Sequence, residues 1–309
     1  MPVAFVTTAD ADAIAGDVDL QPLLDAFGRT DIEIVLAPWE DRSIDWDSFE
    51  LVIIRSTWNY TRRLDEFREW LGSQEDRSTL RNPAGLIGWN MDKRYLGELA
   101  ERGVSVVSTV FVDSIERFDE VVATFEGSEI VVKPTVSAGS RLTGRFGAAS
   151  TAARDLASTI LAEGLSVMVQ PFIASVDVRG EIGTVLFDGN VSHSFGKGAI
   201  LESGGGFIGG TYDERITPGI ASARVLDAVD HVNRVVEQIA HERGWIGRGE
   251  HLLYARFDLI ELDDGSCLLL EAELFEPSTF VEMSRGAGDR FVAAVEAHLE
   301  RLSIIDAKD

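Results

Sequence analysis

Two carboxylates in the last fifth of the chain are spaced to face each other across a β-hairpin. The dipeptide Asp264-Gly265 lies between two apolar runs, and an Asp-Gly pair in that context is a strong hairpin signal. If these residues take the two central turn positions, Asp258 pairs with Glu271. Two positions further from the turn, Arg256 pairs with Glu273. Side chains alternate along a strand, so all four lie on one face of the sheet.

The facing carboxylates need a compensating positive charge. Like charges directly opposite one another destabilise a sheet unless water or a cation offsets them. Magnesium takes oxygen ligands from one or two carboxylates and completes its shell with water and phosphate oxygens. Asp258 and Glu271 therefore favour a magnesium site. The alternative is that the pair lies on a solvated face, with Arg256 merely neutralising Glu273.

A lysine at the end of an apolar strand is suited to bind phosphate. The run Ile130–Lys133 is followed by Pro134 and by a loop of small residues, 135–140, which includes Ser137. One ammonium group and several backbone amides can then reach a phosphate chain. The alternative is that Lys133 only extends its charged end to water. Lys93, which follows Asp92, is open to a similar interpretation as a paired surface residue.

A third segment has the features of a hinge beside an adenine site. The apolar strand 166–170 leads into Pro171, which has no amide hydrogen and interrupts a β-ladder. Exposed backbone next to an apolar wall offers adenine one donor, one acceptor and flat contacts. The segment is therefore suited to hold a nucleotide base beside the hinge.

The elements that must position these residues follow from apolar periodicity. Near the N-terminus apolar runs alternate with helical patterns, which predicts a small parallel α/β unit ending near residue 85. Apolar positions at helical spacing from Val225 to Ile239 predict a long core helix. The other expected elements are strands at 3–6, 32–36, 51–54, 104–107, 130–133 and 166–170, and helices around 64–71, from Asn90 to Gly103 and over 152–163.

Composition and charge exclude several classes of partner. The formal net charge of −24 repels nucleic acid phosphates and anionic lipid heads, so no nucleic acid and no membrane is expected as a partner. No apolar run reaches the about 18 residues of a membrane span, and the N-terminus does not resemble a signal peptide. A soluble, cytoplasmic protein with a small-molecule substrate is the expectation, and a homodimer is left open.

The glycine-rich segment 203–210 does not indicate a dinucleotide site. Its glycines at 204, 206 and 209 satisfy the pattern G-x-G-x-x-G, but no strand-to-helix turn surrounds them. A nicotinamide-dependent dehydrogenase is therefore disfavoured. The segment is interpreted either as a flap over the active site or as plain disorder.

Taken in order, these features resemble the ATP-grasp superfamily of carboxylate ligases, over about residues 80 to 285. The residues that carry the resemblance are Lys93, Val132-Lys133-Pro134, Gln170–Ile173, Asp177–Arg179, Arg256–Asp258 and Glu271–Glu273. The resemblance implies an α/β fold in which two lobes clasp ATP. Residues 1–85 would form an N-terminal parallel α/β domain, residues 86–170 a central α+β lid, and residues 171–309 the C-terminal catalytic domain.

The resemblance also implies roles for individual residues, with ATP and Mg²⁺ as cofactors. Cofactor-binding roles fall to Lys93, Lys133, Ser137, Gln170, Pro171, Phe172 and Asp177, and metal-binding roles to Asp258, Glu271 and Glu273. Arg256 and Lys133 would be catalytic, with Arg256 stabilising the transferring phosphoryl group. Two positions depart from the family pattern. Glu273 stands where Asn is usual, so it either changes the metal shell or turns to Arg256, and Pro171 stands where Glu is more frequent.

The segment Arg55–Tyr60 narrows the resemblance to one branch, the cyclo-ligases that close O-ureido-D-serine into D-cycloserine. Arg55 follows an apolar strand at the end where parallel sheets hold their ligands, and its guanidinium could grip a carboxylate. The alternative is that Arg55 and Trp58 only cap the sheet edge. The substrate-binding residues implied by this branch are Arg55, Thr57, Asn59, Arg179 and Ser278.

The expected reaction is ADP-forming carbon–nitrogen ligation. The substrate carboxylate takes the γ-phosphoryl group of ATP, and a nitrogen of the same molecule attacks the resulting acyl phosphate. Two alternatives stay open. One is an intermolecular amino-acid or peptide ligase, which would differ only in the acceptor pocket. The other is a non-catalytic ATP-binding regulator, against which the intact set of lysines and carboxylates argues.

Overall fold

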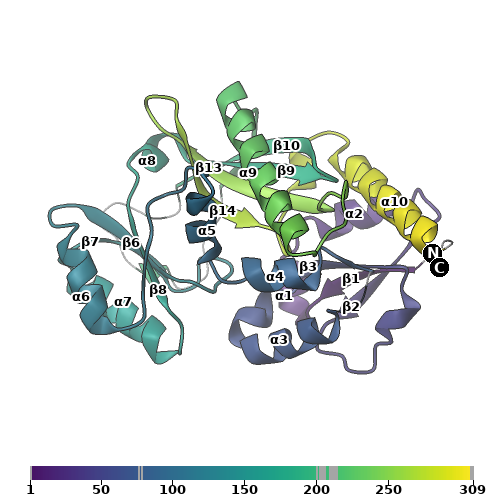
Figure 1. Ribbon diagram of the computed structural model, residues 1–309, viewed down its shortest axis with the longest axis horizontal. Coiled ribbons are helices and arrows are strands. Elements are labelled where there is room, and N and C mark those ends of the chain that lie inside the picture. The colour runs from purple at the N-terminus through teal and green to yellow at the C-terminus, as the bar shows by residue number, and fades with distance from the viewer. Residues whose placement is uncertain are drawn as a thin grey trace.

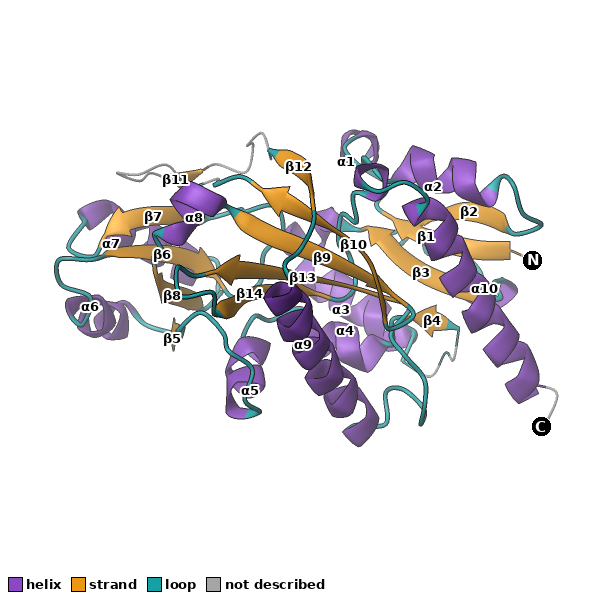
Figure 2. Ribbon diagram, turned by 90° about the horizontal axis from the view of Figure 1, so that it is seen from above, coloured by secondary structure: helices purple, strands orange, loops and turns teal. Residues whose placement is uncertain are grey.

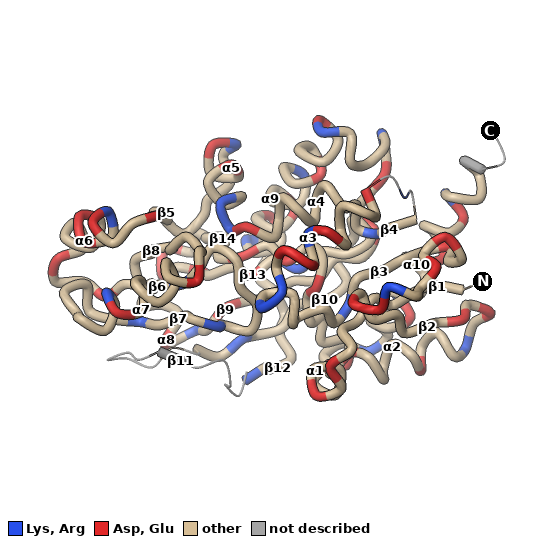
Figure 3. The backbone as a smooth tube through the Cα atoms, turned by 90° about the horizontal axis from the view of Figure 1, so that it is seen from below, with Lys and Arg blue, Asp and Glu red and all other residues tan. Residues whose placement is uncertain are grey.

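The computed structural model describes residues 2–75, 77, 79–199, 201, 207–208 and 215–306, and these form three β-sheets with helices packed around them (Figure 1). Within these residues, no helix combines the length and apolar character needed to cross a membrane. Acidic residues, red in Figure 3, occur around all three sheets along the described chain. The glycine-rich segment 203–210 lies outside the described residues, apart from Phe207–Ile208.

The first sheet confirms the predicted parallel α/β unit. Its strands run parallel in the order β2-β1-β3-β4, and β1 and β3 are almost entirely buried, as expected when helices cover both faces. The C-terminal helix α10 (Ala287–Asp306) packs against it, and Phe291 joins Phe5 and Phe27 in one core (Figure 2). The other elements are β1 (Pro2–Thr7), β2 (Glu33–Pro38), β3 (Leu51–Ser56), β4 (Leu80–Arg81), α1 (Ala11–Ala15), α2 (Leu20–Phe27) and α3 (Leu64–Ser73).

The second sheet is antiparallel, in the order β11-β7-β6-β8-β5, and helices α6 and α7 pack on it. The predicted strands at 130–133 and 166–170 and the helix over 152–163 are confirmed as β6, β8 and α7. The predicted strand 104–107 is wrong, because it makes only one isolated bridge, from Val106 to Leu269. The elements are β5 (Val110–Val112), β6 (Glu129–Pro134), β7 (Thr143–Gly147), β8 (Val167–Pro171), β11 (Phe207–Ile208), α6 (Ile115–Ala123) and α7 (Thr151–Ala162).

The third sheet is antiparallel, in the order β12-β10-β9-β13-β14, and lies between the other two (Figure 2). The predicted long core helix is confirmed as α9, whose apolar face packs against β13 and β14. Figure 1 shows α9 and α5 beside this sheet. The elements are α8 (Ser175–Arg179), β9 (Glu181–Phe187), β10 (Asn190–Lys197), β12 (Ile216–Gly219), α9 (Ala223–Glu242), β13 (Tyr254–Glu261) and β14 (Cys267–Glu273).

The β13–β14 hairpin has the predicted register at the carboxylates but not at the turn. Asp258 pairs with Glu271, and Arg256 pairs with Glu273. The turn runs from Leu262 to Gly265, with Gly265 in the left-handed region at φ 79°, so it holds one residue more than predicted. A bulge between Asp258 and Leu259 shifts the ladder back. The additional turn residue and the bulge therefore compensate each other, so the carboxylates keep the predicted register.

The helix predicted from Asn90 to Gly103 is shorter and begins later, as α5 (Tyr95–Glu101), while a separate helix, α4 (Ala84–Asn90), ends at Asn90. Lys93 lies in the turn between them, where its backbone amide donates to the Thr135 carbonyl at 2.8 Å. This bond joins the turn to the loop that follows β6. The predicted domain boundaries near residues 85 and 170 stay predictions.

Candidate active site

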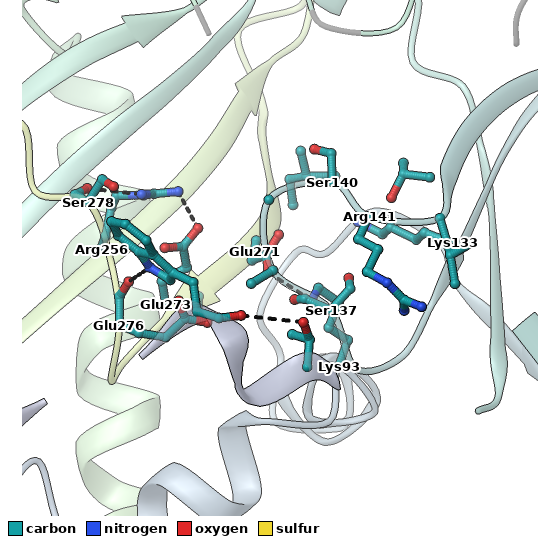
Figure 4. A pocket seen from close by; sticks show the side chains of 18 of the residues that line it. Lys93, Lys133, Ser137, Ser140, Arg141, Arg256, Glu271, Glu273, Glu276 and Ser278 are labelled. Carbon is teal, nitrogen blue, oxygen red and sulfur yellow. Dashed lines mark hydrogen bonds and ion pairs between the residues drawn. The ribbon is translucent and has the colours of Figure 1, made fainter. Parts of the chain in front are cut away.

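A cavity of about 810 Å³ is lined by strands and loops of the second and third sheets and by segments that follow strands of the first sheet. Figure 4 shows Arg256, Glu273 and Glu276 grouped on one side of this cavity, the lysines on the other, and Glu271 between them. The predicted site residues that line it are Asn59, Lys93, Lys133, Ser137, Gln170, Pro171, Phe172, Arg256, Glu271, Glu273 and Ser278. Residues from distant parts of the sequence therefore meet around one space.

Two buried lysines reach the cavity from different elements. Lys93 Nζ lies 3.1 Å from Glu271 Oε1 and donates to the Ser137 carbonyl at 3.0 Å. Lys133 stands near the end of β6, and burial lowers the pKa of its ammonium while Glu271 opposes that effect. Two closely placed cations in a dry site favour a polyanion between them. The pair is suited to a phosphate chain.

Asp258 is held by one cation from its own strand, β13, and by another from β10, two strands away in the same sheet. Arg256 Nε and Nη2 each donate to its carboxylate at 2.9 Å, and Lys197 Nζ donates at 2.7 Å. Burial disfavours the ionised form of Asp258, but Arg256 and Lys197 outweigh burial and lower its pKa to about 2. Asp258 is 1% exposed and does not line the cavity.

Glu271 and Glu273 do line the cavity, with side chains 27% and 26% exposed. Glu273 forms an ion pair with Arg256, yet burial, together with the charges of Asp258 and Glu271, raises the pKa of Glu273 to about 8. The side chains that pair with Glu271 and Glu273 thus compensate the negative charge on β14 only in part. A hard divalent cation would supply the difference, and two carboxylates are suitable donors for Mg²⁺.

The predicted three-carboxylate metal site is not assembled as such. Among the described residues, no group of three or more His, Cys, Asp or Glu side chains is arranged to hold a metal ion. Asp258 turns to Arg256 and Lys197, and Glu273 turns to Arg256, which was one of its two expected alternatives. Glu271 and Glu273 are the carboxylates that line the cavity, and a metal site that also includes Asp258 stays a prediction.

The hinge segment lines the cavity as the sequence predicts. Gln170 is buried and donates to Thr109 Oγ1 at 2.9 Å. The guanidinium of Arg145 lies 3.3 Å from the centre of the Phe172 ring. Asp177 does not line the cavity, because its carboxylate accepts from Arg145 Nη1 at 2.9 Å. Asp177 therefore fixes the cation that stacks on Phe172.

Three predicted substrate-binding residues lie away from the cavity. Arg55 is 1% exposed, and its guanidinium lies 3.4 Å from Asp19 and 3.3 Å from the Pro277 carbonyl. Arg55 does bind a carboxylate, but that carboxylate is the side chain of Asp19 and not a substrate. Thr57 is fully buried, and Arg179 pairs with Asp263 at 2.9 Å on the outside. None of the three side chains lines the cavity, and their contact with substrate stays a prediction.

Several residues of the site were missed in the sequence. Lys197 ends β10 as Lys133 ends β6, and it lies 3.3 Å from Glu181. The same strand-end signal could have found it. Burial raises the pKa of Glu181, which also lines the cavity. Tyr60 and Glu276 line the cavity too. They come together only when the N-terminal sheet packs against the rest of the molecule, and no local sequence pattern predicts that contact.

The three sheets around one shared cavity have the architecture of the ATP-grasp fold. The structure resembles that of D-alanine–D-alanine ligase from Bacillus anthracis complexed with ATP, with a TM-score of 0.67 over 99% of both chains at 13% sequence identity. It also resembles the ATP-grasp ligase PsnB complexed with minimal precursor, Mg and ADP, with a TM-score of 0.59 over 96% of this chain and 98% of that one at 17% identity. At these identities the likeness shows the fold.

The chain belongs to the family of DcsG-like ATP-grasp proteins. It is 35% identical over 305 residues to the cycloserine biosynthesis protein DcsG of Streptomyces lavendulae, covering 96% of this chain and 99% of that protein. The crystal structure of D-cycloserine synthetase DcsG matches 98% of this chain and 100% of that chain, with a TM-score of 0.86 at 32% identity. The family model of the D-cycloserine synthetase DcsG N-terminal domain matches residues 3–82.

Proposed function

We propose that this protein is a cyclo-ligase that uses ATP and Mg²⁺ to close O-ureido-D-serine into D-cycloserine, releasing ADP and phosphate. The observation that carries the proposal is the convergence of Lys93, Lys133, Glu271 and Arg256 on one cavity. The nearly full-length relationship to DcsG supports the choice of substrate.

Different residues along the cavity bind different parts of ATP and the transferring group. Lys93 and Lys133 bind the phosphate chain, while Gln170 and Phe172 contact the base. Arg256 faces the transferring phosphoryl group and compensates its charge, which is the largest contribution a protein makes to such a transfer. Mg²⁺, held by Glu271 and Glu273, would add charge neutralisation between the phosphates. The glutamates fit that ion because of their oxygen donors and their surplus negative charge.

The reaction balances without any further reagent except water. A carboxylate oxygen of the substrate attacks the γ-phosphorus, and ADP leaves. The ureido nitrogen bonded to oxygen then attacks the acyl carbon, which closes a five-membered ring and releases phosphate. Hydrolysis of the carbamoyl group gives carbon dioxide and ammonia. The protein's part in ring closure is to hold the two ends of one molecule together, which replaces a bimolecular encounter.

The proposal is tested by product analysis. Purified protein is incubated with O-ureido-D-serine, ATP and magnesium chloride, ADP release is followed by a coupled assay, and products are identified by mass spectrometry. We expect D-cycloserine and ADP in equal amounts, and none of either without magnesium. If ADP appears only when a second amine is added, the protein is an intermolecular ligase. If ATP binds and no amino acid triggers ADP release, the protein is a regulator.

A further inference from the structure

One carboxylate in the cavity has no role in the chemistry described so far. Glu276 follows the β13–β14 hairpin and lines the cavity beside Trp58 and Tyr60, which belong to the short 3₁₀ helix η2 (Trp58–Arg62). In Figure 4 it lies on the side of Glu273 and Arg256, away from Lys133. It is thus on the opposite side of the cavity from Lys133 (Figure 4).

The backbone that carries Glu276 is held rigidly. Three successive carbonyl groups accept hydrogen bonds from side chains of other elements. The donors are Trp58 Nε1 to residue 276 at 3.1 Å, Arg55 Nη1 to residue 277 at 3.3 Å and Arg256 Nη1 to residue 278 at 2.9 Å. A side chain positioned in this way is preorganised to bind a ligand rather than free to move to the surface.

The other carboxylates at the cavity already have partners. Glu271 pairs with Lys93, Glu273 with Arg256 and Glu181 with Lys197, and Asp10 accepts from the first amides of helix α1. Within the described part of the chain, the carboxylate of Glu276 forms no ion pair and accepts a hydrogen bond from the Tyr60 hydroxyl. Burial, followed by the charge of Glu273, raises the pKa of Glu276 well above its ordinary value. Lys93 opposes this rise only in part, and no cation of the described residues lies within ion-pair distance of Glu276.

The aromatic side chains around Glu276 suit an ammonium group. Tyr60 is 1% exposed and packs against Phe275 at a centroid distance of 5.4 Å, while Trp58 is fixed by its own hydrogen bond. Aromatic faces attract ammonium ions, and a carboxylate among them gives a charged partner in a site with little water. We propose that Glu276 binds the α-ammonium group of the substrate and thereby makes the enzyme select amino acids over simple carboxylic acids.

This inference rests on the proposed function, because it assigns the substrate's amino end to the side of the cavity that carries Glu276. The carboxylate and the ammonium group of the substrate then bind to different residues of the cavity. The carboxylate is drawn toward Arg256 and the metal, and the ammonium toward Glu276. Glu276 is accordingly a specificity residue and takes no part in phosphoryl transfer.

The test compares O-ureido-D-serine with its des-amino analogue, 3-(ureidooxy)propanoate, in wild type, Glu276→Gln and the control Glu282→Gln. Glu282 is an exposed glutamate a few residues further along the chain. In wild type and Glu282→Gln, we expect loss of the amino group to lower kcat/KM about 100-fold, as when one partner of a buried charged hydrogen bond is removed. In Glu276→Gln the two compounds should differ less than about threefold, with the KM for ATP nearly unchanged.

The outcomes separate the two proposals. ADP release by wild type with O-ureido-D-serine supports the proposed function, and its absence overturns both. With wild type active, persistent discrimination in Glu276→Gln overturns the role of Glu276 alone, as does an equal loss for both compounds accompanied by weaker ATP binding. If Glu276→Gln fails to fold, calorimetric affinities of wild type for the two compounds decide, and equal affinities contradict the inference.

Discussion

Arg256 is the side chain on which the charges of the site depend. Its guanidinium donates to Asp258 through Nε and Nη2, to Glu273 through Nη2, and to the Ser278 carbonyl through Nη1. A planar group with five donors can satisfy these partners together, whereas an ammonium group cannot. The two carboxylates therefore fix the orientation of the positive charge that faces the cavity.

We expect Arg256→Lys to lower kcat about 100-fold or more while changing the affinity for a non-hydrolysable ATP analogue by less than about threefold. The lysine keeps the charge but loses the fixed orientation, so transition-state stabilisation suffers more than binding. ADP release gives kcat, and calorimetry gives the affinity. The control is Arg154→Lys, since Arg154 pairs with Asp119 on the exposed surface. A full kcat in Arg256→Lys would exclude a role in transfer.

At this scale, the sequence predicts side chains whose signal is local. Lys133 ends an apolar strand, and Glu271 lies opposite Asp258 by simple alternation, so both could be predicted to matter. Arg55 could not be placed correctly, because its partner Asp19 comes from helix packing and not from a neighbouring strand. Glu276 was missed for the same reason, since its neighbour Tyr60 lies more than two hundred residues away in sequence.

Among the elements, the β13–β14 hairpin shows how a correct register can follow from an incorrect turn. The prediction of a two-residue turn ignored the left-handed Gly265, which lengthens the loop by one residue. The bulge beside Asp258 takes up that residue before the carboxylates are reached. Bulges leave weak traces in sequence, whereas the alternation of Arg256, Asp258, Glu271 and Glu273 is strong because a one-residue slip would turn them to the other face.

Gly180, at the junction of α8 and β9, is the glycine that the site can least replace. Its φ is 70°, and a Cβ atom there would lie 2.1 Å from the carbonyl oxygen of Lys197. We expect Gly180→Ala to lower the free energy of unfolding by about 2 kcal/mol or more, because backbone cannot move aside as a flexible side chain can. Urea unfolding measures this change.

The control is Gly147→Ala at the end of β7, where a Cβ atom meets nothing within 4 Å and the backbone is not left-handed. It should change stability by less than about 1 kcal/mol. Since Lys197 also holds Asp258, the surviving folded fraction of Gly180→Ala should have a lower kcat. Unchanged stability in Gly180→Ala would show that the α8–β9 junction adjusts freely.

Across the whole molecule, a buried cluster joins the N-terminal sheet to the C-terminal helix. Arg81 of β4 donates to His298 Nδ1 at 3.2 Å, and His298 Nε2 lies 3.2 Å from Asp188, which also pairs with Arg301. These contacts require a neutral histidine with its proton on Nε2. Burial, then Arg301 and Arg81, lower the pKa of His298 to about 3, against the attraction of Asp188.

This shift makes the protein sensitive to mild acid. Between about pH 3 and 6.5 the unfolded chain binds a proton at His298 that the native state does not, so stability rises with pH through this range and is lost as pH falls. We expect a loss of about 2 kcal/mol between pH 7 and pH 5 from this group. Urea unfolding at several pH values measures it.

His298→Asn should remove most of this pH dependence, because the side-chain amide does not titrate. The control His231→Asn changes a half-buried histidine that contacts the Gly103 carbonyl, and it should retain the dependence of wild type. Equal slopes of stability against pH in wild type and His298→Asn would contradict the assignment.

The strand that carries Glu271 and Glu273 is the last in its sheet, yet its outer rim is closed. Asn90 and Tyr95 bond the amide and carbonyl of Ala272 and the amide of Leu274, and Asn82 donates to the Leu274 carbonyl. An open rim is a template for pairing with another chain. The side chains of Asn82, Asn90 and Tyr95 thus prevent self-association along the strand that carries the cavity glutamates. Truncating any of them would expose this edge and favour aggregation at the active site.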